Sequence, residues 1–255
     1  MTFKELGVSE EIIKGLQEMG IHAPTKIQEA AIPVLSEGSA DFVGQAQTGT
    51  GKTAAFGLPL LSLIDPAKEE VQALILAPTR ELGQQIARQL FKFTKYSDKI
   101  FTEAVYGGEK IDIQIARLNR PTQIIVATPG RLIDLMKRKA VDIRKIKTLV
   151  LDEADEMLSM GFKNDLTTIL EATASKERNV WLFSATIPQD LNEIINKYVN
   201  KSARRVQIDK QDAVNTGIQH QFVSGDDNSK LDTLSYFLKT MSKKRGIIFT
   251  KTKSA

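Results

Sequence analysis

The sequence contains no cysteine, only two histidines and one tryptophan among its 255 residues. Without cysteine the chain can form no disulfide, no thiolate metal site and no cysteine nucleophile, so we expect it in a reducing cytoplasm. No apolar run approaches the roughly 18 residues that a membrane span requires. Residues 1–6 also lack the basic-then-apolar order of a secretion signal. We therefore expect no membrane partner.

The overall charge and composition say less about function. A composition of 42% hydrophobic and 26% charged residues is typical of a soluble globular protein. The net charge of +4 favours an anionic partner but does not identify nucleic acid. Basic residues gather at 137–139 and 144–147. A solvated helix end is the alternative to a binding patch there.

Strand-like apolar runs alternate with helical patterns through most of the chain, which predicts an α/β fold whose mostly parallel sheet has helices on both faces. The expected strands are 41–45, 72–77, 101–106, 122–127, 146–151, 179–184 and 204–208. Before the sheet, Ile12, Leu16 and Met19 keep helical spacing, with Ser9 placed to cap the helix. A second helix is expected to begin near Thr25.

The pattern changes after residue 208. Residues 209–217 are polar and aperiodic, which predicts a linker between a domain at 1–208 and a further segment at 218–255. That segment shows one strand (218–223), one helix (229–240) and one strand (246–249). Because 38 residues are too few for an α/β domain, we expect only the start of a second domain.

A glycine-rich turn joins the strand at 41–45 to a helix expected at 52–64. Its backbone N–H groups and the following helix N-terminus would form a concave anion site. Lys52 would reach the β- and γ-phosphates of a nucleotide, and the Thr53 hydroxyl would hold Mg²⁺. The common phosphate-loop pattern has glycine where this chain has Ala46, and a Gly/Thr-rich surface turn is the alternative. The assigned residues are Ala46, Gln47, Thr48, Gly49, Thr50, Gly51, Lys52 and Thr53.

Carboxylates follow the strand at 146–151 directly. Since ligands in open α/β sheets lie beyond the carboxyl ends of the strands, these side chains should face the phosphates. We assign Asp152 to Mg²⁺, and Glu153 to orienting or deprotonating the attacking water. The alternative is an acidic first helical turn. At the end of the strand at 179–184, hydroxyls of Ser184 and Thr186 are expected to bond Asp155 and sense the phosphate.

Further short segments occur in a fixed order along the chain. They are Pro78-Thr79-Arg80-Glu81-Leu82, Gly107-Gly108, Thr128-Pro129-Gly130-Arg131 and Ile247-Ile248-Phe249-Thr250. Together with Asp152-Glu153-Ala154-Asp155, they make essentially the whole chain resemble a DEAD-box RNA helicase of the bacterial type. The phosphate loop of that family typically begins with alanine. The resemblance implies a RecA-like P-loop fold and RNA-stimulated ATP hydrolysis coupled to local RNA unwinding or remodelling of RNA–protein complexes.

Residues 20–28 resemble the glutamine motif of the same family, with Phe3 as its upstream aromatic residue. The Gln28 amide would pair with the N6 and N7 edge of adenine, and Phe3 would stack on the base. Thr25 and Gln28 also have the spacing of a helix capping box, which is the alternative for this segment. Both roles are compatible.

The resemblance further implies an RNA track lined by Thr79, Arg80, Gly108, Thr128, Gly130 and Arg131. Strand-to-helix turns at two of these places suit phosphate contacts, so binding should tolerate any sequence and weaken with salt. Structural salt bridges of Arg80 and Arg131 are the alternative. The sequence identifies no RNA-degradation or ribosome-assembly partner.

Two other functions fit parts of the pattern. An ATP-gated RNA clamp would use hydrolysis only to time release, and a DNA helicase or remodeller would share the architecture. Asp155, Gln28 and the segment 78–82 argue against the DNA enzyme. In the resembled family a second domain supplies transition-state arginines, so residues 1–255 alone should bind ATP or ADP with Mg²⁺, bind RNA weakly and hydrolyse ATP slowly.

Overall fold

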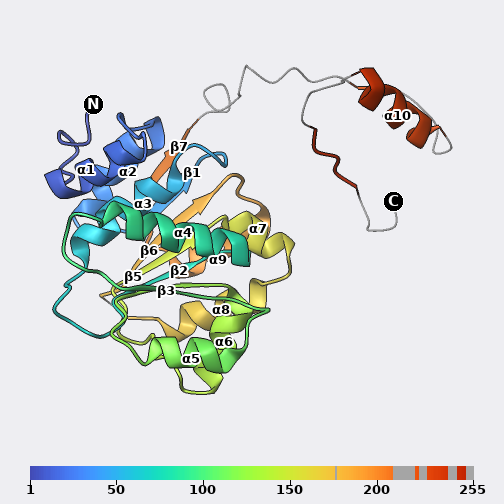
Figure 1. Ribbon diagram of the computed structural model, residues 1–255. Coiled ribbons are helices and arrows are strands. Elements are labelled where there is room, and N and C mark those ends of the chain that lie inside the picture. Colours follow the sequence, from blue (N-terminus) through green and yellow to red (C-terminus); the bar gives the residue numbers. More distant parts are fainter. Residues whose placement is uncertain (176, 209–221, 224–228, 241–245, 251–255) are drawn as a thin grey trace. The chain divides into compact units, whose positions relative to one another are not determined.

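Figure 1 shows a computed structural model of the chain, which describes residues 1–175, 177–208, 222–223, 229–240 and 246–250. The chain divides into two units, Met1–Val214 and Asn215–Ala255. The first contains a seven-stranded sheet, and the second contains helix α10 (Lys230–Thr240), which confirms the helix predicted at 229–240.

Three other predictions concern the residues after 208. The predicted linker at 209–217 and most of the strand predicted at 218–223 lie outside the described residues. Residues 246–250 are described and form no strand, so the strand predicted at 246–249 is not found. A strand is held by hydrogen bonds to a neighbouring strand. The neighbour expected for the strand at 246–249 is the strand at 218–223, most of which lies outside the described residues.

All seven strands of the first unit are parallel and follow the order β3-β4-β2-β5-β6-β1-β7. They comprise β1 (Phe42–Gln45), β2 (Ala73–Leu76), β3 (Thr102–Val105), β4 (Ile124–Ala127), β5 (Thr148–Asp152), β6 (Asn179–Ser184) and β7 (Arg204–Gln207). Each of the seven strands predicted between residues 41 and 208 is present, with its ends within two residues of the prediction. The parallel α/β fold is therefore confirmed.

Helices cover both faces of this sheet (Figure 1). They are α1 (Glu10–Glu18), α2 (Lys26–Ser36), α3 (Lys52–Leu63), α4 (Arg80–Phe93), α5 (Ile111–Leu118), α6 (Pro129–Lys137), α7 (Ala154–Ser159), α8 (Lys163–Ala172) and α9 (Gln189–Tyr198). Ile75 and its like-facing strand neighbours pack against α1–α4, whereas Leu74 and its neighbours pack against α5–α9. Successive strand residues point to opposite faces, which divides the core into two layers.

Helix caps fix where the functional segments begin. Ser9 Oγ accepts a hydrogen bond from the Ile12 N–H at 3.4 Å, as predicted for α1. Thr79 Oγ1 likewise accepts from the Leu82 N–H at 3.2 Å and starts α4 at Arg80. In the described part of the chain, no helix has both the length and the apolar character needed to cross a bilayer.

Candidate functional site

Apart from Phe3, every predicted site segment of the first unit follows a strand at the carboxyl edge of the sheet or lies against a segment that does. The neighbouring strands β1, β6 and β5 end at the phosphate loop, at Ser184 and at Asp152. On the other side of β5, strands β2, β4 and β3 lead to Arg80, Thr128 and Gly108. The predicted nucleotide and RNA residues thus occupy adjoining halves of one edge, where parallel α/β sheets bind their ligands.

The glycine-rich segment forms a loop between β1 and α3, not a surface turn. The Ala46 N–H donates to the Ser184 carbonyl at 3.0 Å, which continues the pairing of β1 with β6. Gly51 has a φ of +89°, and a Cβ atom added to it would lie 2.3 Å from Gln28 Nε2. Glycine is therefore required there for both its conformation and its lack of a side chain.

Lys52 begins α3 with a buried side chain that is 6% exposed. Its Nζ atom has no hydrogen-bond partner among the described residues. Burying an unpaired ammonium is costly, so proteins rarely keep one without an anionic ligand. This ammonium fits the phosphates of a nucleotide held by the loop. Thr53, the second residue of α3, is half-buried beside it in sequence.

Asp152 ends β5 with only 2% of its surface exposed. Burial raises the pKa of its carboxyl to about 7, the positive charge of Lys52 opposes the rise, and the like charge of Glu153 adds to it. Asp152 Oδ1 accepts a hydrogen bond from the Glu153 N–H at 3.0 Å. A carboxylate and a hydroxyl are oxygen ligands of the kind that Mg²⁺ takes alongside water and phosphate, so Asp152 and Thr53 fit the predicted metal.

Glu153 has a left-handed backbone with a φ of +51° at the N-cap of α7. That conformation costs a non-glycine residue about 1–2 kcal/mol, and such strain often marks functional sites. Asp155 and Glu156 occupy the first turn of α7, so the acidic helix start also exists. Glu153 precedes that turn, so the preference of acidic residues for a first helical turn does not account for its carboxylate.

The expected hydrogen bonds around Asp155 are present. Its Oδ2 accepts from the Thr186 N–H at 2.8 Å and from the Thr186 hydroxyl at 2.7 Å, while its own N–H donates to Ser184 Oγ at 3.1 Å. Burial acts to raise the pKa of Asp155, but these hydrogen bonds outweigh it and lower the pKa. The segments after β5 and β6 are thus joined; their role in sensing phosphate stays a prediction.

The side-chain amide of Gln28 makes two hydrogen bonds. Its Oε1 accepts from the Thr25 N–H at 3.0 Å, and its Nε2 donates to the Gly51 carbonyl at 3.0 Å. The Thr25 hydroxyl donates to the Thr50 carbonyl at 2.8 Å. The capping contact is therefore real, and it also ties α2 to the phosphate loop. One N–H and one lone pair of the amide remain for adenine.

The structure places Phe3 differently from the other predicted ATP residues. Its side chain is 3% exposed and belongs to the apolar cluster around α1–α4. No open ring face is presented to a base in this arrangement. Stacking of Phe3 on adenine stays a prediction that requires the N-terminal segment to move.

The two arginines of the predicted RNA track make no ion pair with any described carboxylate. The Arg80 guanidinium lies over the ring of Tyr106, 4.7 Å from its centroid. Arg131 Nη2 donates to the Glu109 carbonyl at 3.0 Å. Gly108 is exposed with a φ of +85°. The structural salt bridges considered as the alternative are therefore not found for either arginine among the described residues, and their contact with phosphate stays a prediction.

Thr128 and Gly130 start α6 on either side of Pro129. The Thr79 hydroxyl accepts a hydrogen bond that caps α4. A contact of this hydroxyl with RNA would use its O–H donor or its second lone pair. The structure brings these three residues to the same sheet edge as Arg80 and Gly108. Their contact with RNA stays a prediction.

Sequence reasoning missed a polar network beneath the track. Gln114 is fully buried, and its Nε2 donates to the Tyr106 carbonyl at 3.0 Å and to Glu109 Oε2 at 2.8 Å. Arg117 forms ion pairs with Glu103 at 3.1 Å and with Glu109. One signal was available: Gln114 shares the helix face of Ile111 and Leu118, where an apolar residue is expected.

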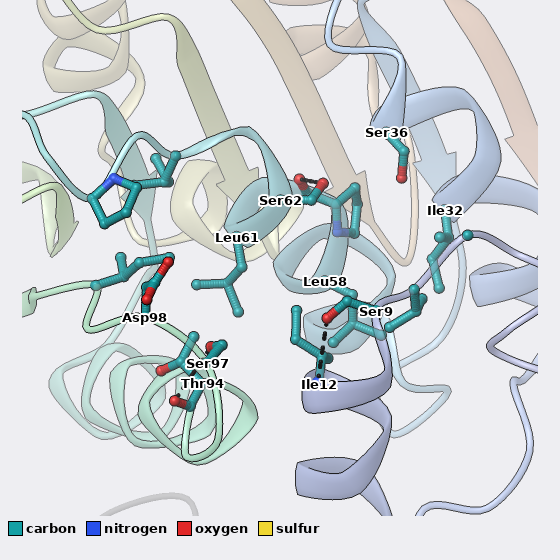
Figure 2. A pocket seen from close by; sticks show the side chains of 16 residues that line it. Ser9, Ile12, Ile32, Ser36, Leu58, Leu61, Ser62, Thr94, Ser97 and Asp98 are labelled. Atoms are coloured by element: carbon teal, nitrogen blue, oxygen red, sulfur yellow. Dashed lines mark hydrogen bonds between the residues drawn. The ribbon is translucent and has the colours of Figure 1, made fainter.

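A cavity of about 210 Å³ lies elsewhere, lined by side chains such as Ile12, Leu58 and Leu61 (Figure 2). It takes residues from the end of α3 and from beyond the end of α4, including Ser62 and Thr94. Lys52 and Arg80 begin these helices, and α3 is about 18 Å long. The cavity is thus remote from the predicted site and includes none of its residues.

Comparison with known proteins gives one family and several relatives. Residues 25–194 match the family described as "DEAD/DEAH box helicase". The "ATP-dependent RNA helicase CshA" of Listeria monocytogenes is 43% identical over 98% of this chain and 48% of its own length. The "RNA helicase CrhR" of Synechocystis is 45% identical over 99% of this chain and 50% of its own length.

Solved structures also resemble this chain. A DEAD box protein from Methanococcus jannaschii superposes with a TM-score of 0.77 at 35% identity, over 94% of this chain and 63% of the other. A structure described as a hypothetical ATP-dependent RNA helicase from Sulfolobus tokodaii gives 0.71 at 34% identity, over 78% and 57%. The chain spans about half the length of the curated relatives it matches.

Proposed function

Because the chain belongs to the DEAD/DEAH box helicase family, we propose that it carries the ATP-binding part of an RNA-dependent ATPase. In the complete protein, ATP hydrolysis would drive local separation of RNA duplexes or remodelling of RNA–protein complexes. The observation that carries this proposal is the buried, unpartnered ammonium of Lys52 at the head of α3, beside buried Asp152. The relative named an ATP-dependent RNA helicase supports ATP as the polyphosphate, and both named relatives support RNA as the polymer.

The domain division is also a proposal. Residues 1–208 would form the RecA-like ATP-binding domain, 209–217 a linker and 218–255 the beginning of a second RecA-like domain. The boundary between the two compact units, after Val214, lies within the proposed linker. The cysteine-free sequence supports a cytoplasmic location for the protein.

In the nucleotide site, loop N–H groups of residues 46–53 and the Lys52 ammonium would hold the phosphates. Thr53 and Asp152 would hold Mg²⁺, whose chemistry is to neutralise charge on the β- and γ-phosphate oxygens. Glu153 would orient the attacking water and accept its proton. Asp155, hydrogen-bonded to Ser184 and Thr186, would transmit the state of the phosphate between strand ends.

In the RNA half of the edge, Thr79, Arg80, Gly108, Thr128, Gly130 and Arg131 would contact the sugar–phosphate backbone. Such contacts position RNA without reading bases. RNA affinity should therefore depend little on sequence and fall steeply with salt.

Two assays on the complete protein test the proposal. We expect ATPase activity to rise with single-stranded RNA and not with DNA of the same sequence, and a short RNA duplex to be separated when ATP is present. RNA-stimulated turnover without strand separation would instead support the ATP-gated clamp. Equal stimulation by DNA would overturn the assignment of RNA as the substrate.

Gln28→Ala should weaken the preference for ATP over GTP. A bidentate amide–adenine pair discriminates by about 1–3 kcal/mol, or roughly 5- to 150-fold. Stability should also fall, by about 1–3 kcal/mol, because the hydrogen bonds to the Thr25 N–H and to the Gly51 carbonyl both disappear. Calorimetry with ATP and GTP, and a thermal melt without nucleotide, measure the two effects.

Thr25→Ala provides the matched control. It removes the hydrogen bond from Thr25 to the Thr50 carbonyl and so disturbs the same loop, but it removes no group that could read the base. We expect unchanged nucleotide preference in this variant. If Gln28→Ala lowers the melting temperature while its ATP preference matches that of Thr25→Ala, Gln28 serves only as a helix cap.

A further inference from the structure

We propose that Tyr106 is a positioning residue for RNA binding, which holds the Arg80 guanidinium beside the exposed Gly107–Gly108 turn while leaving its charge free for a phosphate. The proposal rests on the proposed function, because it takes Arg80 as an RNA contact. Tyr106 itself is buried at 6% exposure and would not touch RNA.

The first step is the placement of Arg80. Its side chain is exposed at the start of α4, and its guanidinium lies 4.7 Å from the centroid of the Tyr106 ring. Arg80 Nη1 would lie 3.7 Å from a Cβ atom built on Gly108. The ring thus orients a side chain that has many rotamers in solution, and directs it to the turn that follows β3.

The second step is that the contact with the Tyr106 ring does not neutralise the positive charge of Arg80. A carboxylate would offset the positive charge and occupy the guanidinium N–H donors, whereas an aromatic face attracts the cation and leaves the donors free. The pKa of Glu109 is lowered mainly by its hydrogen bond from Gln114, then by Arg117 and least by the charge of Arg80, so this carboxylate is already engaged by Gln114 and Arg117. A phosphate would therefore find Arg80 oriented and unpaired.

The third step is that Tyr106 is itself held at both ends. Gln84 lies one helical turn after Arg80 on α4, and its Nε2 donates to the Tyr106 hydroxyl at 2.7 Å. The Tyr106 carbonyl accepts from buried Gln114 of α5 at 3.0 Å. The ring is thus fixed between two helices, so its position does not depend on bound RNA.

Three variants of the complete protein test this role. Tyr106→Leu removes the ring, Tyr106→Phe keeps the ring but loses the bond to Gln84, and Gln84→Leu loses that bond from the other side. We expect Tyr106→Leu to raise the RNA concentration for half-maximal ATPase by about three- to tenfold. The rate at saturating RNA and the ATP affinity should not change. Tyr106→Phe and Gln84→Leu should give smaller increases.

Background variants separate positioning from general damage to the fold. In an Arg80→Ala protein, Tyr106→Leu should have no further effect, because it acts through Arg80. In an Arg131→Ala protein its full effect should remain, since Arg131 is bound by the Glu109 carbonyl and not by the ring. If Tyr106→Leu does not fold, Gln84→Leu is tested in the same two backgrounds.

The control is Tyr96→Leu, a tyrosine beyond the other end of α4 that carries Lys14 and Lys95 over its ring at 4.2 Å and 5.1 Å. It should not alter RNA half-saturation. The same fold-change from Tyr106→Leu with and without Arg80 would overturn the positioning role. If Arg80→Ala alone leaves RNA half-saturation unchanged, the fault lies instead in the proposed RNA track.

Discussion

Lys52→Ala should abolish measurable ATP binding. The ammonium is buried without a partner at the head of α3, so the phosphates would be its counter-charge. Removing one member of a buried charge pair costs about 2–5 kcal/mol or more, which corresponds to a loss of affinity of roughly 30-fold to several thousandfold. Isothermal titration calorimetry of ATP with Mg²⁺ measures this directly.

Lys52→Met separates binding from folding. Methionine keeps most of the volume of the side chain, so no cavity is left, while the unpaired buried charge disappears. The nucleotide-free protein should then be as stable as the parent or more stable, and ATP should no longer raise its melting temperature. A Lys52→Met protein that binds ATP normally but melts earlier would show that Lys52 serves the core and not the nucleotide.

The fold and the location of the site were accessible from the sequence because both depend on local patterns. Apolar runs such as 124–127 predict where the strands lie, and a parallel sheet brings the carboxyl ends of all its strands to one edge. The topology therefore placed motif residues that lie at a strand end or shortly after one, such as Asp152 at the end of β5 and Arg80 after β2. The phosphate loop is the clearest case, since strand, loop and helix are consecutive.

What could not be predicted depends on contacts between distant segments. The burial of Phe3 among the apolar residues of α1–α4 is not revealed by any local pattern, and its stacking on adenine stays a prediction. The left-handed conformation of Glu153 is equally invisible, since glutamate has no preference for it. The pairing of Gln84 with Tyr106 joins residues 22 positions apart on separate elements.

Glu153→Gln should retain ATP affinity and lose hydrolysis. The amide keeps the size of the side chain and part of its hydrogen bonding but cannot accept a proton from water. A general base contributes about 10²–10⁴-fold, so RNA-stimulated turnover in the complete protein should fall by that order. Calorimetry for ATP and a phosphate-release assay at saturating RNA measure the two quantities. Glu156→Gln is the control, because Glu156 is exposed in the adjoining turn of α7 and should leave turnover unchanged.

Glu153→Gly tests why a strained residue stands at this position. With a φ of +51°, glycine would occupy the same backbone without the cost that a side chain incurs there. We expect a protein at least as stable as the parent in thermal melts and as inactive as Glu153→Gln, which would show that the strain is tolerated for the sake of the carboxylate. Normal turnover in either variant would refute Glu153 as the base. A marked loss of stability in Glu153→Gly would instead mean that the side chain supports the fold.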